Sequence, residues 1–165
     1  MAFVGATVFC PHPKQGVCIF VSRRGAPEDL GGIPGGKLDP EETPSAAAHR
    51  EFQEETGFQL SGLSPEPLFT SVARETNALC HAFLGRLSPD DWAALITKAG
   101  ETGYAGPEGL VVRVAPWRMM MDEDQVAFAD FNCRFFQHIR ASASSQDLFE
   151  ALGLGHIYAD ILKQS

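Results

Sequence analysis

The chain has 165 residues, 44% of them hydrophobic, which is typical of one soluble globular domain with a real core. Its formal net charge of -8 disfavours a surface for a nucleic-acid polymer, since such surfaces are usually basic. A small phosphate ligand is not excluded, because a bound metal ion can supply positive charge locally. No basic-then-apolar start or long apolar run is present, so we expect no membrane partner and a cytoplasmic protein.

The first half of the chain predicts two strands followed by a loop. Segments 2–10 and 16–22 are short, apolar and rich in β-branched and aromatic residues, as in two strands joined by a polar turn. Arg23 and Arg24 come next. They could contact substrate phosphates, because guanidinium matches phosphate geometry, or could form a solvated strand end. The glycines and prolines of 25–36 then predict a loop.

A helix is predicted over 43–56. Thr43 can accept a hydrogen bond from a free amide at the helix start, and Pro44 suits the first helical position. Alanines 46–48 favour helix, and Gly57 suits the residue at which a helix ends.

One face of this helix carries three carboxylates at positions i, i+3 and i+4: Glu51, Glu54 and Glu55. Like charges in this arrangement destabilise a helix, and Arg50 relieves only part of the repulsion. Mg²⁺ could relieve the rest, because it takes carboxylate oxygens together with substrate phosphates. Glu42 could add an oxygen, and Gly35 and Gly36 leave room for a ligand. The pattern indicates a metal–phosphate site, although such a run is also found on solvated faces of amphipathic helices.

The spacing extends beyond the helix. After Gly36 come five residues, then Glu42, then seven residues, then REFQEETGF (50–58). This stretch resembles the complete signature of the Nudix hydrolase family. The resemblance implies an α/β fold, a Nudix-type α/β/α sandwich with a mixed β-sheet, and we expect residues 1–165 to form a single Nudix domain. It also implies hydrolysis of a nucleoside diphosphate linked to another group, with Mg²⁺ or Mn²⁺ as cofactor.

The resemblance also implies roles for residues of the box. Glu54 and Glu55 are the first expected metal ligands, and Glu51 is a ligand or the base that activates water. Arg50 would orient the carboxylates, and Glu42 would support them through that arginine or through a metal-bound water. Further contributions are expected from the carbonyl of Gly36, from the turns at Gly35 and Gly57, and from the core anchors Phe52 and Phe58.

The second half of the chain predicts strands and helices in alternation. Strands are expected at 67–74, 77–86 and 110–114, and helices from Ser88 to Lys98, at 126–139 and within 146–163. The loop 99–109 carries two acids. Glu108 is the first candidate, and Glu101 the second, for a metal ligand or general base outside the box. Solvated loop acids remain the alternative.

The substrate is the least constrained feature. The resemblance to nucleotide-sanitising relatives in AFADFN (127–132) suggests that Asn132 hydrogen-bonds a purine edge, with an ordinary polar residue on a core helix as the alternative. This favours a (d)NTP substrate over ADP-ribose or another nucleotide sugar. A non-catalytic nucleotide sensor is a third interpretation, disfavoured because all four carboxylates of the box and Arg50 are present.

We expect a monomer or homodimer. The four cysteines are interpreted as reduced core residues: Cys10, Cys18, Cys80 and Cys133.

Overall fold

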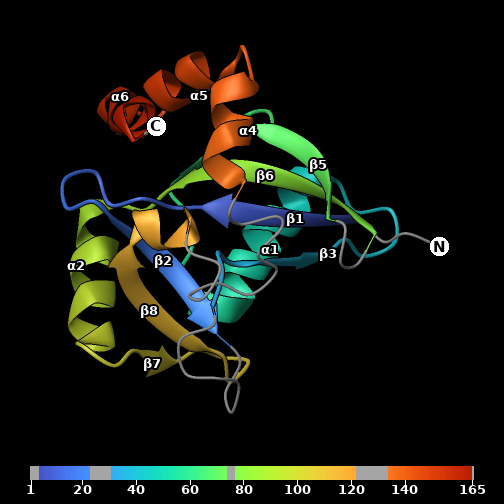
Figure 1. Ribbon diagram of the computed structural model, residues 1–165. Helices are drawn as coiled ribbons and strands as arrows, with labels where there is room; N and C mark the ends of the chain where they lie inside the picture. The colour runs from blue at the N-terminus through green and yellow to red at the C-terminus, as the bar shows by residue number, and fades with distance from the viewer. Residues whose placement is uncertain (1–3, 23–30, 74–76, 122–133, 165) are drawn as a thin grey trace.

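A mixed β-sheet runs through the middle of the molecule (Figure 1). The computed structural model describes residues 4–22, 31–73, 77–121 and 134–164. Strands β1 and β6 are parallel, and their other pairings in this sheet are antiparallel. Strand β5 pairs with β6 beside the path β3-β1-β6-β4. The strands of this sheet are β1 (Val4–Phe9), β3 (Gly35–Lys37), β4 (Gly62–Leu63), β5 (Phe69–Ala73) and β6 (Ala78–Arg86).

A second, antiparallel sheet contains β2 (Val17–Ser22), β8 (Val111–Pro116) and β7 (Tyr104–Ala105), in that order. Strand β8 extends to Pro116, which pairs with Val17, whereas the sequence predicted an end before the proline. Strand β7 pairs with β8 only at Val111 and Val112. The N–H that Pro116 lacks is therefore not needed for hydrogen bonds between β8 and β7.

The first two helices of the chain begin at the capping residues that the sequence predicted. Thr43 Oγ1 accepts a hydrogen bond of 3.2 Å from the amide of Ala46, and Gly57 ends the helix with φ of 82°. Ser88 caps the second helix through the amide of Asp91. The helices are α1 (Pro44–Thr56), α2 (Pro89–Ala99), the 3₁₀ helix η1 (Trp117–Met121), α4 (Phe135–Ala141), α5 (Ser145–Ala151) and α6 (Gly155–Lys163).

Helices cover both faces of the mixed sheet, so the expected α/β/α sandwich is confirmed. Alternation along β1 directs Val8 to the cluster that contains Phe52 of α1, and Phe9 to the opposite cluster. On that opposite side, Phe9 contacts Phe135 and Phe136 of α4 with ring centroids 5.3 and 5.9 Å apart. In Figure 1, α4 to α6 lie above the sheet and α1 lies behind it.

Three short strands, β3, β4 and β7, fall where the sequence predicted only loops. The predicted helix 126–139 is helical from Phe135, and its part at 126–133 lies outside the described residues.

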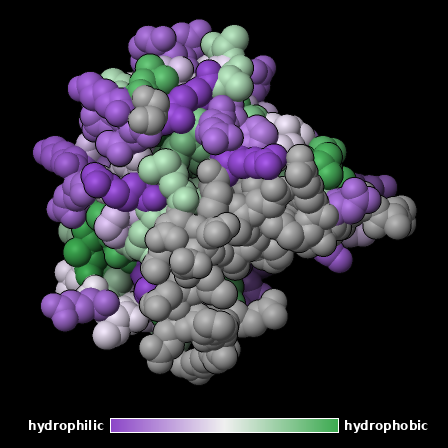
Figure 2. Space-filling view, in the orientation of Figure 1, coloured by the Kyte–Doolittle hydropathy of each residue, from purple (hydrophilic) through white to green (hydrophobic). Residues whose placement is uncertain are grey.

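Within the described segments, no helix is both long and apolar enough to span a bilayer. Figure 2 shows hydrophilic side chains over much of the C-terminal helices. The described cysteines are free thiols, with Cys10 and Cys18 buried and Cys80 half-buried; Cys133 is outside the described residues.

Candidate active site

Helix α1 is anchored by its apolar side. Phe52 is fully buried between the helix and the sheet, and Phe58 packs against the same cluster, so both are the core anchors that the sequence predicted. This anchoring directs the charged side of α1 toward the glycine-rich strand β3 and the turn between β7 and β8.

Arg50 is the centre of a polar network on that charged side. Its Nε and Nη2 donate to the two oxygens of Glu42 at 2.8 and 2.9 Å. Its Nη1 donates to Glu51 at 2.9 Å and to Glu54 at 3.0 Å. The hydrogen bonds from Arg50 lower the pKa of Glu42 to about 2. One guanidinium group therefore links the loop acid to two acids of the helix.

Two residues that the sequence analysis did not single out, one at the end of β3 and one in the loop after it, complete this network. The carbonyl of Lys37 accepts a hydrogen bond of 2.9 Å from Arg50 Nη2. Asp39 Oδ2 lies 3.4 Å from Arg50 Nε. The contact with the Lys37 carbonyl could not be predicted from the sequence, because every residue has a backbone carbonyl. It depends on the position of β3 beside Arg50.

Three carboxylates meet beside Arg50. Glu51, Glu54 and Glu108 each have an oxygen within 4.8 Å of an oxygen of the other two. Glu101, the second candidate acid of the loop, is exposed and is not in this group of described residues. The structure thus brings an acid from outside the box to two acids of the box helix.

Glu108 lies at the tip of a tight turn between β7 and β8. Gly109 N donates to Gly106 O at 2.9 Å, and Gly106 N donates to Leu110 O at 2.8 Å. Pro107 suits the second position of such a turn, and Gly109 follows with a φ of 85°. The sequence predicted a loop here, and these hydrogen bonds close part of it into a turn that fixes the backbone at Glu108.

Gly36 leaves the space that the carboxyl group of Glu51 occupies. A Cβ atom on Gly36 would lie 2.6 Å from both Cδ and Oε1 of Glu51. Burial raises the pKa of Glu51, and the hydrogen bond from Arg50 opposes that rise. A residue with a side chain at position 36 would therefore clash with the carboxyl group of Glu51, whereas glycine does not.

Glu55 takes a different position from the other two helix acids. Its side chain is buried, and Oε1 accepts a hydrogen bond of 2.8 Å from the amide of Gly35. Burial raises its pKa to about 8. Glu55 is not in the group of three carboxylates, but the negative charges of Glu51, Glu108 and Glu54 add to the rise of its pKa.

The donor set fits a hard divalent cation. Glu51, Glu54 and Glu108 offer carboxylate oxygens, the ligands that Mg²⁺ takes in proteins, and no soft sulfur ligand is among them. Arg23, Arg24 and Asn132, the expected substrate contacts, lie outside the described residues.

Comparison with protein families shows the family of the chain. A family model described as "NUDIX domain" matches residues 1–125. The chain belongs to the Nudix family. It is a Nudix-type hydrolase, and membership implies hydrolysis of pyrophosphate in nucleoside diphosphate derivatives by enzymes that use divalent metals.

A solved structure supports the fold independently. The Nudix chain is similar to a nudix hydrolase family member from Chromobacterium violaceum, with a TM-score of 0.62 and 18% sequence identity. The match covers 100% of this chain and 98% of that one, so it includes α4 to α6 beyond residue 125. Among curated proteins, none matches the sequence significantly.

Proposed function

We propose that this Nudix hydrolase cleaves a pyrophosphate bond of a (d)NTP or a related nucleotide, with Mg²⁺ as its cofactor. The observation that supports this best is the meeting of Glu51, Glu54 and Glu108, whose oxygens lie within 4.8 Å of one another. The preference for a (d)NTP rests on the sequence around Asn132, which lies outside the described residues.

In this proposal Glu51, Glu54 and Glu108 hold the cation, and the Gly36 carbonyl and Glu55 are further ligands from the box. Mn²⁺ could replace Mg²⁺, since both take oxygen ligands. When bound, the cation supplies positive charge that neutralises the pyrophosphate oxygens. One of these acids also supplies the base, through a carboxylate oxygen that does not bind the cation.

The residues of the chain perform the proton transfer and the positioning. A water oxygen attacks one phosphorus, the bond from that phosphorus to the bridging oxygen breaks, and the water proton passes to a carboxylate oxygen. Glu51 is our first choice for this base, because it belongs to the group of three carboxylates and is partly buried, whereas Glu108 is exposed. Glu108 is the second choice.

Arg50 has a positioning role in this mechanism. Its hydrogen bonds to Glu51 and Glu54 keep two carboxylates in fixed orientations, and Glu42 holds the arginine from the other side. The turns at Gly35 and Gly57 support the two ends of the arrangement. Arg23 and Arg24 would bind the phosphates, and Asn132 the base.

The proposal treats residues 1–165 as one domain, because α4 packs on β1 in the same core as the strands of the family match. It places the protein in the cytoplasm, where thiols such as those of Cys10, Cys18 and Cys80 stay reduced, and takes it to be a monomer or homodimer.

The test is product release from (d)NTPs, ADP-ribose, nucleotide sugars and dinucleoside polyphosphates, with Mg²⁺ and with EDTA. Glu54→Gln, Glu55→Gln in one chain is the inactive control. We expect Mg²⁺-dependent turnover of a (d)NTP that the double variant lacks. Turnover of ADP-ribose or another nucleotide sugar instead would change the substrate class. Tight nucleotide binding without turnover would identify a sensor and refute the enzyme.

Asn132→Ala tests the base contact separately. We expect the ratio of kcat/KM between purine and pyrimidine nucleotides to fall toward one, with the phosphate chemistry retained. Unchanged selectivity would remove Asn132 from the proposal.

A further inference from the structure

The C-terminal end of α1 is fastened to the hairpin of β7 and β8. The last carbonyl groups of a helix have no partner within the helix and need one from elsewhere. The hydroxyl group of Tyr104 donates to the carbonyl oxygen of Thr56 at 2.6 Å, in a buried hydrogen bond. Tyr104 thus satisfies a helix-end acceptor and joins β7 to α1.

A second contact lies two residues further along the hairpin. The backbone of Gly106 packs directly on the carbonyl of Glu55, so that a Cβ atom on Gly106 would overlap this oxygen. The ring of Pro107 lies beside Gly57, where a Cβ atom would be 3.5 Å away. Only a glycine at 106 allows the hairpin to approach α1 this closely.

The tyrosine ring is itself held in place. It is 9% exposed, and the Lys98 ammonium of α2 lies 4.6 Å from the ring centroid. Burial raises the pKa of Tyr104 to about 12, so its hydroxyl group remains a donor at neutral pH. The contact to Thr56 is therefore a fixed link between α2, β7 and α1.

These contacts determine the position of Glu108. The turn from Gly106 to Gly109 is closed by its own hydrogen bonds, so Glu108 moves with Gly106 as one unit. Glu51 and Glu54 belong to the helix on which this unit rests. A shift between hairpin and helix would separate Glu108 from them.

We propose that Tyr104 and Gly106 are positioning residues that hold the turn 106–109 on the end of α1 and so keep Glu108 beside Glu51 and Glu54. Neither residue is assigned a contact with substrate. The inference rests on the proposed function, since it takes the three carboxylates as cation ligands.

The test is Mn²⁺ binding to the substrate-free protein, with free Mn²⁺ counted by electron paramagnetic resonance. Tyr104→Phe keeps the ring and removes only the hydroxyl donor, so we expect roughly tenfold weaker binding, as for groups that orient metal ligands. Gly106→Ala should weaken binding at least as much. Both proteins are checked by circular dichroism and thermal melting.

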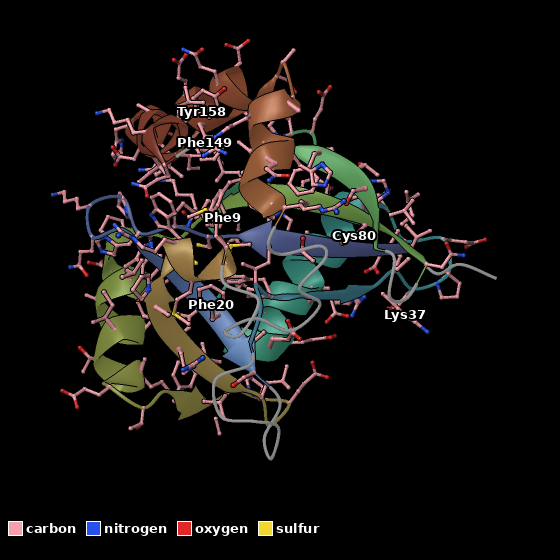
Figure 3. The ribbon with its side chains drawn as sticks, viewed as in Figure 1. Phe9, Phe20, Lys37, Cys80, Phe149 and Tyr158 are labelled. Carbon is pink, nitrogen blue, oxygen red and sulfur yellow. The ribbon has the colours of Figure 1, made fainter. Side chains whose placement is uncertain are left out.

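The Glu108→Gln background separates positioning from general damage. If Tyr104 acts through Glu108, adding Tyr104→Phe to Glu108→Gln changes Mn²⁺ affinity by less than about twofold, because the two changes share one mechanism. The matched control is Tyr158→Phe on α6, which removes the same atom beside Phe149 among the C-terminal helices (Figure 3) and should bind Mn²⁺ like the wild type.

Several results would overturn the inference: unchanged affinity in both Tyr104→Phe and Gly106→Ala, an equally large effect with and without Glu108, no effect of Glu108→Gln, or no Mn²⁺ binding by the wild type. Failure of the proposed function looks different. A wild type that binds Mn²⁺ through Glu108 and Tyr104 but hydrolyses no nucleotide would refute the activity and retain the positioning.

Discussion

Gly36→Ala tests whether the position of Glu51 determines activity. The added Cβ atom would lie 2.6 Å from Glu51 Cδ. Two carbon atoms in contact prefer about 3.5 Å, so the carboxyl group or the strand must move by about 1 Å. A displacement of about 1 Å in a reacting group can lower the rate about 100-fold. We therefore expect kcat/KM to fall by about this factor at saturating Mg²⁺.

The same change should affect stability, and a second substitution isolates the cause. The added atom meets only the end of the Glu51 side chain, so the loss in the free energy of unfolding should lie at the low end of the range for overpacking, at about 1 kcal/mol. Glu51→Asp in the Gly36→Ala chain shortens the side chain by one methylene group and withdraws the carboxyl group from the added atom. The double variant should regain most of the lost stability without regaining activity.

The assay combines initial rates on the preferred nucleotide with denaturant unfolding. Gly62→Ala in β4 is the control, because its Cβ atom would meet the flexible end of Leu152 at 3.3 Å. Wild-type kcat/KM in Gly36→Ala would refute the reasoning, since Glu51 would then have moved at no cost. A double variant as unstable as Gly36→Ala would refute the assigned clash.

Three further predictions concern α1. Arg50→Lys keeps the charge but loses the planar fork that reaches Glu42 and two other acids, so kcat should fall about tenfold or more in steady-state assays; unchanged kcat would mean that charge alone suffices. In EDTA, native Glu55 keeps its proton up to a pKa of about 8 while the unfolded chain ionises near the ordinary value of 4.5. The free energy of unfolding should therefore fall as pH rises between these values, and urea titrations should show a smaller fall for Glu55→Gln. An identical pH dependence in the variant would contradict this assignment. Phe52→Ala empties a fully buried position and should cost about 3–5 kcal/mol in the same titrations; a loss below 1 kcal/mol would mean that the core refills the space.

The helices that begin at a capping residue were predictable from the sequence. Thr43 and Ser88 cap their helices through the hydroxyl groups that the capping pattern requires. Strand β3 was not predictable, because two of its three residues are glycines and its pairing depends on the backbone of β1. Short strands of this kind exist only when a partner strand is in place.

In the candidate site too, local patterns were predictable from the sequence and tertiary contacts were not. Glu51 and Glu54 share a helix, so periodicity alone places them on one face. The periodicity also included Glu55, whose carboxyl group instead accepts the Gly35 amide across to β3. Glu108 was one of two acids in an eleven-residue segment, 99–109, and its place beside the helix depends on the packing of Gly106. That packing is tertiary and has no local pattern.

The origin of Glu108 in a distant part of the chain links cation binding to folding. A site that needs oxygens from both α1 and the β7–β8 turn exists only when the two are packed together, and the unfolded chain offers no equivalent. A cation bound by all three acids would shift the folding equilibrium toward the native state. At one hundred times its dissociation constant it would add about 2.7 kcal/mol to the free energy of unfolding. The midpoint of thermal unfolding would then rise with Mg²⁺ concentration, so that the cofactor would also act as a stabiliser of the fold.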